Sequence, residues 1–330
     1  MKKTRVAING AGRIGRAFYK LALKRPELEV VAINDLGDKE NIAYLLKYDT
    51  VYGQSDVSLE GVKFLSEKEA KNLPWKDLDI DVVVESTGFY TKYELAKDHI
   101  DAGAKRVVVT APMKDEPTTI EGATVLLGIN EDKFETSIIT SNASCTTNAA
   151  SPVLAILDEA LGVEKAILNT VHSYTASQGI VDGPNKKDFR EGRAAAQNIV
   201  PSSTGAAIAV GKALKQLDGK FDGISIRVPT VIGSIADITF ITKRDTTVEE
   251  INKILTEASK TEKWKNIFEV TSEPIVSSDV RDSAHASIAD LNFTRVVGGN
   301  LVKVLAWYDN EMGYTHTLVE HVVKLGNAIK

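Results

Sequence analysis

Cys145 is the only cysteine of this 330-residue chain, and it lies in a run of small polar residues, SNASCTTN, at positions 141–148. An apolar, β-branched segment precedes the run, and apolar residues at helical spacing follow it. The junction between a strand and a helix leaves backbone N–H groups unpaired at the positive end of the helix dipole. Such surroundings favour the thiolate, which is the nucleophilic form of cysteine. We therefore predict that Cys145 is a catalytic nucleophile.

Two features of this segment leave alternatives open. A lone cysteine is commonly a small buried hydrophobe with no chemical role, although a core cysteine would be expected among Val, Leu and Ile rather than in SNASCTTN. Pro152 has no backbone N–H to donate within a helix. The helix therefore either begins after Cys145 or bends in its second turn.

His172 stands at the end of a predicted strand, residues 165–171, where its side chain can reach a second strand–helix junction. A lone histidine is more often structural than catalytic, but the other four histidines lack this setting. Pairing with histidine is the usual way to activate a thiol and to transfer protons in later steps. We predict that His172 is the catalytic partner of Cys145.

The segment GAGRIG at positions 10–15 follows a short predicted strand and opens a predicted helix. In a βαβ unit, Gly10 would permit the tight turn, Gly12 the approach of a pyrophosphate, and Gly15 close packing of helix on strand. The helix N-terminus would face the phosphates. Asp35 follows the second strand, where its carboxylate would accept hydrogen bonds from both ribose hydroxyls and repel a 2′-phosphate. An ordinary βα turn is the alternative, but the combined spacing predicts a dinucleotide site that prefers NAD to NADP.

Two further apolar segments, 81–88 and 106–112, are typical of buried strands that end in small polar residues. Continuous apolar strands separated by helices predict an α/β domain of the Rossmann type, with a doubly wound parallel sheet covered on both faces. Ligands bind beyond the carboxyl ends of such strands. The residues at these strand ends are therefore candidate cofactor contacts, namely Thr87, Gly88, Thr110 and Ala111. Termination of the strands would explain these residues equally well.

The second half of the chain carries several candidate anion-binding residues. Residues 178–197 form a long polar loop that contains Arg193, and Thr204 and Gly205 open a predicted helix. A loop of that length inside a compact domain is usually functional or disordered. Arg227 lies in an otherwise apolar strand, where a buried guanidinium needs a partner. A phosphate and a structural carboxylate are the two candidates.

Alternating strands at 235–242 and 301–308, with a terminal helix over 310–330, predict an α+β second domain whose sheet is mixed or antiparallel. The length indicates two domains. A net charge of −5 gives no electrostatic case for nucleic acid as the main partner. We find no apolar run long enough to span a bilayer, and we predict no metal site. Because a reactive lone thiol persists best in a reducing compartment, we expect a cytoplasmic protein.

With these residues in hand, the sequence resembles phosphorylating glyceraldehyde-3-phosphate dehydrogenases almost from end to end. The motif at 141–148 is highly specific to this family and to the related erythrose-4-phosphate dehydrogenases, and Thr175 favours the first. The other matching motifs are NGAGRIGR at 9–16, LLKYDT at 45–50, HSYT at 172–175, STGAA at 203–207, RVPT at 227–230 and WYDNE at 307–311.

The resemblance implies an NAD-dependent oxidoreductase of glycolysis and gluconeogenesis, which converts D-glyceraldehyde 3-phosphate and inorganic phosphate into 1,3-bisphosphoglycerate. Cys145 would attack the aldehyde to give a thiohemiacetal, hydride would pass to NAD, and phosphate would cleave the resulting thioester. His172 would activate the thiol and, with the backbone N–H of Cys145, stabilise the oxyanion. The alternatives are an erythrose-4-phosphate dehydrogenase, a non-phosphorylating aldehyde dehydrogenase, or a catalytically silent dinucleotide-binding protein.

The resemblance also implies which residues bind which group. Asn310 would hold the nicotinamide carboxamide, and Thr175 and Arg227 would form one phosphate site. The site for inorganic phosphate would use the remaining anion-binding candidates, which are Ser144, Thr204, Gly205 and Arg193. Further cofactor and substrate contacts are expected at Arg13, Ile14, Tyr314 and Thr146.

The expected domains are an NAD-binding domain, residues 1–144 with 310–330, and a catalytic domain, residues 145–309. The family is tetrameric, so the resemblance implies a homotetramer. Two departures from the family pattern are Ala11, in place of the usual aromatic residue, and Ser177, in place of a frequent aspartate. Neither departure removes a catalytic group.

Overall fold

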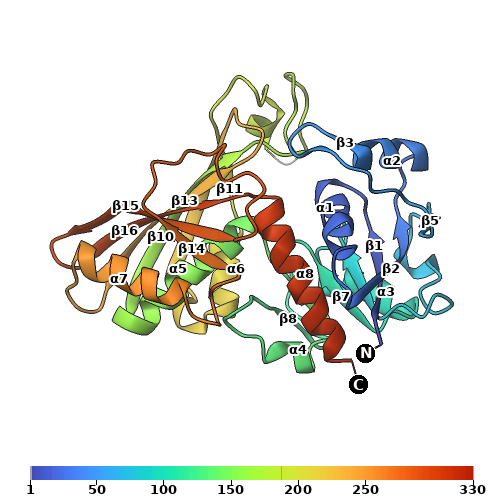
Figure 1. The fold of residues 1–330 in the computed structure, drawn as a ribbon, viewed down its shortest axis with the longest axis horizontal. Coiled ribbons are helices and arrows are strands. Elements are labelled where there is room, and N and C mark those ends of the chain that lie inside the picture. Colours follow the sequence, from blue (N-terminus) through green and yellow to red (C-terminus); the bar gives the residue numbers. More distant parts are fainter. Residues whose placement is uncertain (1, 187, 330) are drawn as a thin grey trace. The chain divides into compact units, whose positions relative to one another are not determined.

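The computed structural model describes residues 2–186 and 188–329 and divides the chain into two compact units (Figure 1). Unit 1 comprises the residues up to 144 and those from 315 onward, and unit 2 comprises residues 145–314. The return to unit 1 therefore falls at 315 rather than at the predicted 310. The difference arises because Asn310 accepts hydrogen bonds from Ser173 Oγ and Gly233 N inside unit 2.

Unit 1 contains a seven-stranded sheet in the order β5-β2-β1-β6-β7-β9-β8, and every neighbouring pair in it is parallel. Strands β2 and β5 lie on one side of β1, and β6, β7, β9 and β8 lie on the other side, so the strand order reverses between β1 and β6. Such a reversal is where ligands bind in open α/β sheets. The strands are β1 (Thr4–Asn9), β2 (Leu28–Asn34), β5 (Lys63–Leu65), β6 (Val82–Glu85), β7 (Arg106–Val109), β8 (Gly122–Thr124) and β9 (Ile139–Ser141).

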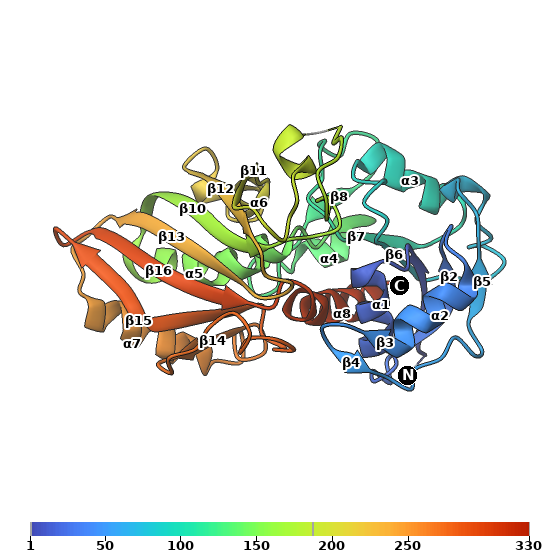
Figure 2. The same ribbon diagram turned by 90° about the horizontal axis from the view of Figure 1, so that it is seen from above.

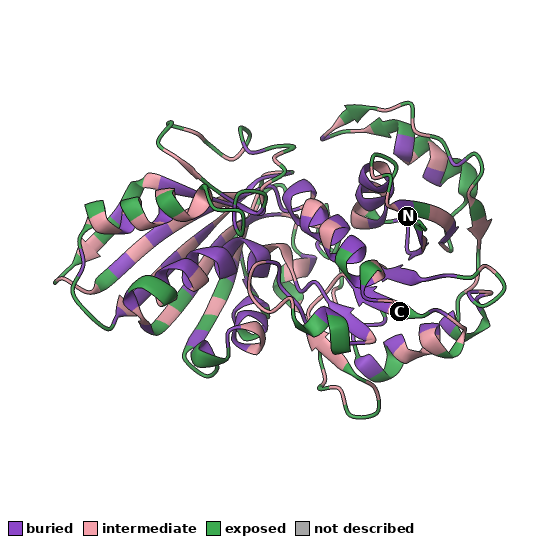
Figure 3. Ribbon diagram, turned by 60° about the horizontal axis from the view of Figure 1, so that its bottom comes forward, coloured by how far each residue is buried: buried purple, intermediate pink, exposed green. Residues whose placement is uncertain are grey.

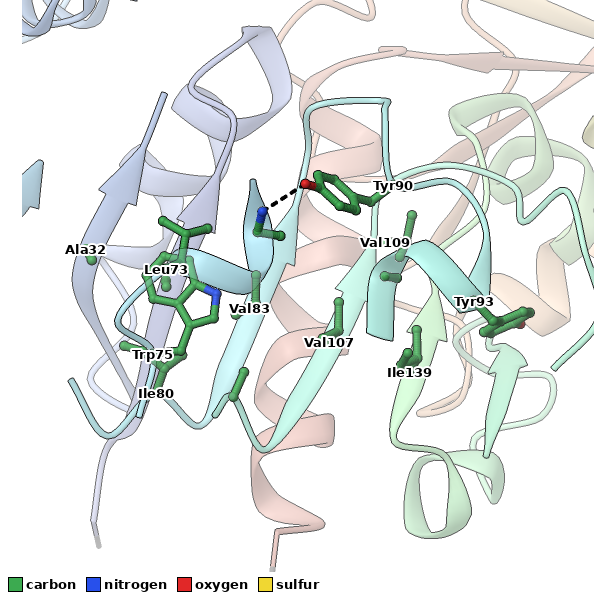
Figure 4. Packing of buried hydrophobic residues seen from close by; sticks show 14 of the residues in the cluster. Ala32, Leu73, Trp75, Ile80, Val83, Tyr90, Tyr93, Val107, Val109 and Ile139 are labelled. Carbon is green, nitrogen blue, oxygen red and sulfur yellow. Dashed lines mark hydrogen bonds between the residues drawn. The ribbon is translucent and has the colours of Figure 1, made fainter. Parts of the chain in front are cut away.

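Both faces of this sheet are buried, as predicted. Val83 belongs to a cluster with Trp75 and Tyr93 on one face, while its neighbours Val82 and Val84 are also fully buried. Figure 4 shows the cluster in front of the strands and helix α8 behind them. The helices of unit 1 are α1 (Arg13–Ala22), α2 (Lys39–Lys47), α3 (Tyr93–Asp101), α4 (Lys133–Thr136), the short η1 (Ala70–Asn72) and most of α8 (Met312–Asn327); a small hairpin joins β3 (Tyr48–Asp49) to β4 (Gly53–Gln54).

Unit 2 contains a second seven-stranded sheet, in the order β11-β12-β10-β13-β16-β15-β14. Two of its strand pairs, β10 with β12 and β14 with β15, are parallel, and the others are antiparallel. We predicted a mixed or an antiparallel sheet, and the sheet is mixed. The strands are β10 (Val163–Ser173), β11 (Val200–Ser203), β12 (Phe221–Val228), β13 (Ser234–Thr242), β14 (Phe268–Thr271), β15 (Ser287–Val297) and β16 (Leu301–Tyr308).

Helices cover one face of the second sheet. Residues along β13 and β16 alternate between buried and partly exposed, which is the pattern of a sheet with one covered face (Figure 3). Figure 2 shows the covering helices beside the strands, and α5, α6 and α7 contact β13, β12 and β15 respectively. These helices are α5 (Cys145–Leu161), α6 (Ala206–Ala213) and α7 (Val248–Ser259), with two short turns, η2 (Phe189–Gly192) and η3 (Lys215–Leu217).

Helix α5 begins at Cys145 itself and contains Pro152. The alternative that the helix begins after Cys145 is therefore wrong. No helix in the described part of the chain is both long enough and apolar enough to cross a membrane.

Candidate active site

Cys145 and His172 lie together in unit 2. Cys145 is the first residue of α5, and His172 is the last but one of β10. The Cys145 Sγ atom lies 3.4 Å from His172 Nε2. Cys145 is partly exposed, whereas His172 is only 4% exposed. A sulfur atom within hydrogen-bond reach of an imidazole, and still accessible, has the geometry of a nucleophile beside its base.

The backbone just before Cys145 makes a strained turn. Ala143 has a φ of 54°, in the left-handed region that residues with a Cβ atom rarely adopt. Ser141 Oγ accepts a hydrogen bond from Ala143 N at 2.9 Å and donates one to Ala111 O at 2.6 Å. These two bonds hold the turn and so fix the point at which the chain leaves the strand.

The surroundings favour the uncharged forms of both side chains. Burial, reinforced by the charge of Arg227, lowers the pKa of His172 to about 3, so the imidazole is neutral at neutral pH. Burial also raises the pKa of the Cys145 thiol above its ordinary value, against lowering contributions from Arg227 and Thr146. The predicted stabilisation of the thiolate by the helix N-terminus is thus outweighed by desolvation. Cys145 is a thiol beside a neutral base.

Arg227 faces His172 across the parallel pair of β10 and β12. Its Nη1 atom lies 2.7 Å from His172 Nδ1 and 3.1 Å from Ser173 O. Its Nε atom is buried and has no hydrogen-bond partner among the described residues. The Arg227 guanidinium makes no ion pair with any described residue. The structure therefore does not support the alternative that a carboxylate of the protein is its partner. A buried, unsatisfied cationic donor fits an anion.

The side-chain amide oxygen of Asn310 accepts three hydrogen bonds. The oxygen accepts from Ser173 Oγ at 2.9 Å, Ser234 Oγ at 3.1 Å and Gly233 N at 3.2 Å. The side chain is 6% exposed, so these bonds fix its orientation. What Asn310 can offer a ligand is therefore the Nδ2 amide group, which is a donor.

In unit 1, the glycine turn has the geometry that the sequence predicts. Gly10 has a φ of 99°, and a Cβ atom added to Gly15 would lie 2.0 Å from Gly10 O. A Cβ atom on Gly12, the residue that caps α1, would meet nothing within 4 Å. The N-terminus of α1 is thus open where a phosphate would approach.

Asp35 follows β2 and is held by backbone amides. Its Oδ2 accepts from Ala11 N at 2.6 Å, and its Oδ1 accepts from Gly37 N at 2.7 Å. Each oxygen keeps a further lone pair, so the carboxylate can still accept from ribose hydroxyls. The carboxylate is therefore anchored to the glycine turn, as a dinucleotide site of this type requires.

Two stretches of the chain match known family models. Residues 4–93 match the family model described as the NAD binding domain of glyceraldehyde 3-phosphate dehydrogenase, and residues 144–310 match the model of its C-terminal domain. The chain belongs to the glyceraldehyde 3-phosphate dehydrogenase family. The resemblance seen in the motifs is confirmed.

Several curated proteins with the name glyceraldehyde-3-phosphate dehydrogenase are similar over nearly their whole length. The protein from Mycobacterium avium is 45% identical over 344 residues, covering 98% of this chain and 99% of that protein. The Geobacillus stearothermophilus protein is 44% identical over 329 residues, covering 96% of each. A protein named glyceraldehyde-3-phosphate dehydrogenase 1, from Kluyveromyces lactis, is 44% identical over 333 residues, covering 96% of this chain and 99% of the relative.

Among the phosphate-binding candidates in this glyceraldehyde 3-phosphate dehydrogenase family member, Thr146 and Arg227 contact the Cys145–His172 pair. Arg193 instead pairs with Asp182, its Nε atom 3.1 Å from Oδ2, with both side chains largely exposed. The other hydroxyl candidates bond locally: Thr175 Oγ1 lies 3.3 Å from Ser177 Oγ, and Thr204 Oγ1 accepts from Ala206 N at 3.2 Å. Gly205 caps α6, and Ser144 is half-buried.

Tyr308 is a site residue that sequence reasoning missed. Its hydroxyl lies 2.9 Å from Thr146 Oγ1 and 2.7 Å from Thr170 Oγ1, and its ring packs edge-on against His172 with centroids 5.8 Å apart. Burial raises the pKa of Tyr308, so the hydroxyl is a neutral donor and acceptor. The signal available in the sequence was a polar aromatic residue ending an apolar strand.

A buried carboxylate, Glu85, organises the ends of β1 and β6 and was also missed. Its Oε1 accepts from Thr87 N at 2.8 Å and from Thr87 Oγ1, while its Oε2 accepts from Asn9 Nδ2 at 2.6 Å and lies 3.0 Å from His99 Nε2. Trp75 Nε1 donates to His99 Nδ1 at 3.0 Å, which places the ring proton on Nε2. Thr87 is thus held in place by Glu85.

The remaining cofactor candidates have structural partners of their own. Thr110 N donates to Glu85 O at 2.9 Å, and Ala111 O accepts from Ser141 Oγ, so strand termination explains both residues as well as cofactor contact does. Arg13 Nη1 lies 2.7 Å from Asp49 Oδ2. Ile14 is half-buried, Tyr314 is buried, and Gly88 has a φ of 73°.

Proposed function

We propose that this protein is a phosphorylating glyceraldehyde-3-phosphate dehydrogenase, which oxidises D-glyceraldehyde 3-phosphate with NAD and inorganic phosphate to 1,3-bisphosphoglycerate. The observation that carries the proposal is the 3.4 Å approach of Cys145 Sγ to His172 Nε2, in a chain of this family. A silent dinucleotide-binding protein would have no need of this pair.

Cys145 is the nucleophile in this proposal. Its Sγ atom forms a bond to the aldehyde carbon, while the thiol proton passes to His172 Nε2 and a thiohemiacetal results. The pKa of about 3 keeps His172 neutral before the attack, as a base must be. The carbonyl oxygen gains negative charge in this step. The backbone N–H of Cys145, in the first turn of α5, and the protonated His172 are the donors that stabilise it.

The cofactor site fits a dinucleotide on two observations: the open N-terminus of α1 at Gly12 and the anchored carboxylate of Asp35. Gly12 and the first amides of α1 would hold the pyrophosphate, and Asp35 the adenosine ribose. Asn310 Nδ2 would donate to the carboxamide oxygen of the nicotinamide. When bound, NAD supplies the hydride acceptor that turns the thiohemiacetal into a thioester on Cys145.

Inorganic phosphate then completes the reaction. A phosphate oxygen bonds to the thioester carbon, the carbon–sulfur bond breaks, and the sulfur leaves with its electron pair, which releases the acyl phosphate. The orphaned Nε of Arg227 supports an anion site next to His172. We assign the substrate phosphate to Thr175 and Arg227, and inorganic phosphate to Ser144, Thr204, Gly205 and Arg193.

Steady-state NAD reduction tests this proposal. The unmodified protein should sustain NAD reduction over many turnovers with D-glyceraldehyde 3-phosphate only when phosphate is present, and Cys145→Ser should abolish the reaction. Undiminished turnover without phosphate would indicate a non-phosphorylating dehydrogenase. A higher kcat/KM with erythrose 4-phosphate would indicate the related enzyme.

We further propose that the protein is a cytoplasmic homotetramer. The face of the second sheet opposite α5 carries Ile167 and Ile224, which are 61% and 54% exposed. Exposed apolar side chains on neighbouring strands support burial against another subunit. A lone thiol at the candidate site supports a reducing compartment. Light scattering at several protein concentrations tests the assembly, and a stable monomer would contradict it.

A further inference from the structure

The carboxylate of Glu85, at the end of β6, is buried among hydrogen-bond donors. Its Oε1 atom accepts from the backbone N–H and the hydroxyl of Thr87, and its Oε2 atom accepts from Asn9 Nδ2 and faces His99 Nε2. Glu85 is 1% exposed, and no lysine or arginine in the described part of the chain forms an ion pair with it. These four donors therefore replace the water that would surround a carboxylate at the surface.

The partners of Glu85 require both of its oxygens to accept. His99 Nδ1 accepts from Trp75 Nε1 at 3.0 Å, so the neutral ring carries its proton on Nε2 and donates it to Glu85. The NH₂ group of Asn9 and the backbone N–H of Thr87 can only donate. A proton on Glu85 Oε1 would weaken that oxygen as an acceptor for the Thr87 N–H, 2.8 Å away. The proton between Glu85 and the Thr87 hydroxyl therefore belongs to Thr87.

The Thr87 hydroxyl is left with one free position for a hydrogen bond. Its proton goes to Glu85, and its oxygen already accepts from Phe89 N at 3.0 Å. A hydroxyl has one proton and two lone pairs, so one lone pair remains. Thr87 is exposed, whereas the carboxylate that holds it is buried. A ligand can therefore donate to Thr87, but Thr87 has no proton to give in return.

The end of β6 lies where a dinucleotide would bind in this sheet. It is next to β1, at the point where the strand order reverses. The phosphate oxygens of a dinucleotide can only accept hydrogen bonds, whereas its ribose hydroxyls can also donate. To bind a phosphate, Thr87 would have to withdraw its proton from a buried carboxylate, and such charge-assisted bonds are roughly twice as strong as neutral ones. A ribose hydroxyl requires no such exchange.

We propose that Glu85 is a positioning residue of the cofactor site, which takes the Thr87 proton and so makes Thr87 an acceptor for a ribose hydroxyl of NAD rather than a donor to its phosphates. The same carboxylate also reaches the other half of the site. Asn9 Oδ1 accepts from Asn34 Nδ2 at 2.7 Å, and Asn34 immediately precedes Asp35. The residues at the ends of β2 and β6 are thus joined by one buried network.

Calorimetric titration with three ligands tests the role of Thr87 without any turnover. ADP carries both phosphates and one ribose, 2′,3′-dideoxy-ADP carries the phosphates but no ribose hydroxyl, and ADP-ribose adds the second ribose. Thr87→Val should weaken the binding of ADP-ribose by about two- to tenfold, the usual worth of one hydrogen bond. It should leave the binding of dideoxy-ADP unchanged.

The pattern across the ligands identifies the group that Thr87 binds. A loss with both ADP and ADP-ribose assigns the hydroxyl to the adenosine ribose, and a loss with ADP-ribose alone assigns it to the second ribose; both support the proposal. An equal loss with dideoxy-ADP would show that Thr87 donates to a phosphate. That result, or no loss with any of the three ligands, would overturn the proposal. Because no aldehyde is present, the outcome does not depend on which substrate the enzyme oxidises.

A second comparison tests Glu85 itself. Glu85→Gln places an NH₂ group against donors on one side of the site, so it should weaken the binding of ADP-ribose. Because Glu85 acts through Thr87, the double variant with Thr87→Val should lose less than the sum of the two single losses, and fully additive losses would overturn the role of Glu85. If Glu85→Gln does not fold, Thr87→Val and the dideoxy ligand decide alone. The matched control is Thr119→Val, which removes an exposed hydroxyl that donates to the carboxylate of Glu94 at 2.6 Å and should change no affinity.

Discussion

His172 and Arg227 are register partners on the parallel strands β10 and β12, with Arg227 Nη1 2.7 Å from His172 Nδ1. The arginine expected to bind phosphate therefore also contacts the candidate base. This relationship joins the anion site to the nucleophile through a single imidazole ring.

Replacing Arg227 with lysine keeps the charge but removes the planar fork of donors. Arg227→Lys should raise the KM for phosphate, since each lost charge-assisted bond costs about 1.5–3 kcal/mol. The melting temperature should change little, because the guanidinium makes no ion pair among the described residues. Arg295→Lys is the matched control, because Arg295 lies in the same unit and donates to the carbonyls of Asn292 and Thr294. A lower melting temperature with unchanged KM values would show that Arg227 is structural.

Removing the candidate base should slow the reaction without unfolding the protein. We expect His172→Asn to lower turnover by about 10²–10⁴, the usual span for a lost acid–base group. The control is His285→Asn, because His285 lies outside the candidate site and contacts Glu269 and Lys265. Turnover within a factor of two of the unmodified enzyme across the pH range would mean that His172 is not the base.

The parts of the site that follow local rules could be predicted from the sequence. The turn at Gly10, the packing at Gly15 and the place of Asp35 after a strand each depend on a few neighbouring residues, and the structure has them all. The strand and helix patterns likewise predicted one parallel sheet and one mixed or antiparallel sheet, and the second sheet is mixed.

Contacts set by strand register could not be predicted. His172 and Arg227 are 55 residues apart, and no local signal fixes how their strands pair. The pKa of Cys145 depends on desolvation by the whole fold, which outweighs the helix end that the sequence does reveal. Pro152 left two possibilities open, a helix that begins after Cys145 or a helix that bends in its second turn. The choice between them depends on how α5 packs, which the local sequence does not reveal.

Asp35 should govern the choice between cofactors. Two charges about 4 Å apart near a protein surface interact by ~1–4 kcal/mol, so Asp35→Ala should narrow the preference for NAD over NADP by about tenfold or more. The variant also frees Ala11 N and Gly37 N, which loosens the turn. The ratio of kcat/KM values for the two cofactors measures the effect. Equal efficiency in the unmodified protein would contradict the assignment.

His321 should make unit 1 sensitive to acid. It is fully buried, with Nε2 2.7 Å from Thr140 Oγ1 and Nδ1 3.3 Å from Asn142 Oδ1, and burial lowers its pKa to about 3. The neutral form therefore stabilises the fold above the unfolded pKa of about 6.5, and this contribution is lost as the pH falls toward the folded value of about 3.

Denaturant unfolding of His321→Gln between pH 7 and pH 4 measures this contribution. The variant should be less stable at pH 7, but its free energy of unfolding should fall less steeply with acid. One proton bound on unfolding accounts for at most about 1.4 kcal/mol per pH unit. An unchanged slope would show that His321 does not titrate in this way.

Rapid mixing of the protein with NAD and D-glyceraldehyde 3-phosphate, first without phosphate, tests the central claim most directly. A covalent intermediate on Cys145 predicts a burst of one NADH per chain that then stops, because the thioester has no acceptor. Adding phosphate should restore steady turnover, and Cys145→Ser should show neither phase. No burst, or steady turnover before phosphate is added, would contradict a phosphorylating mechanism through Cys145.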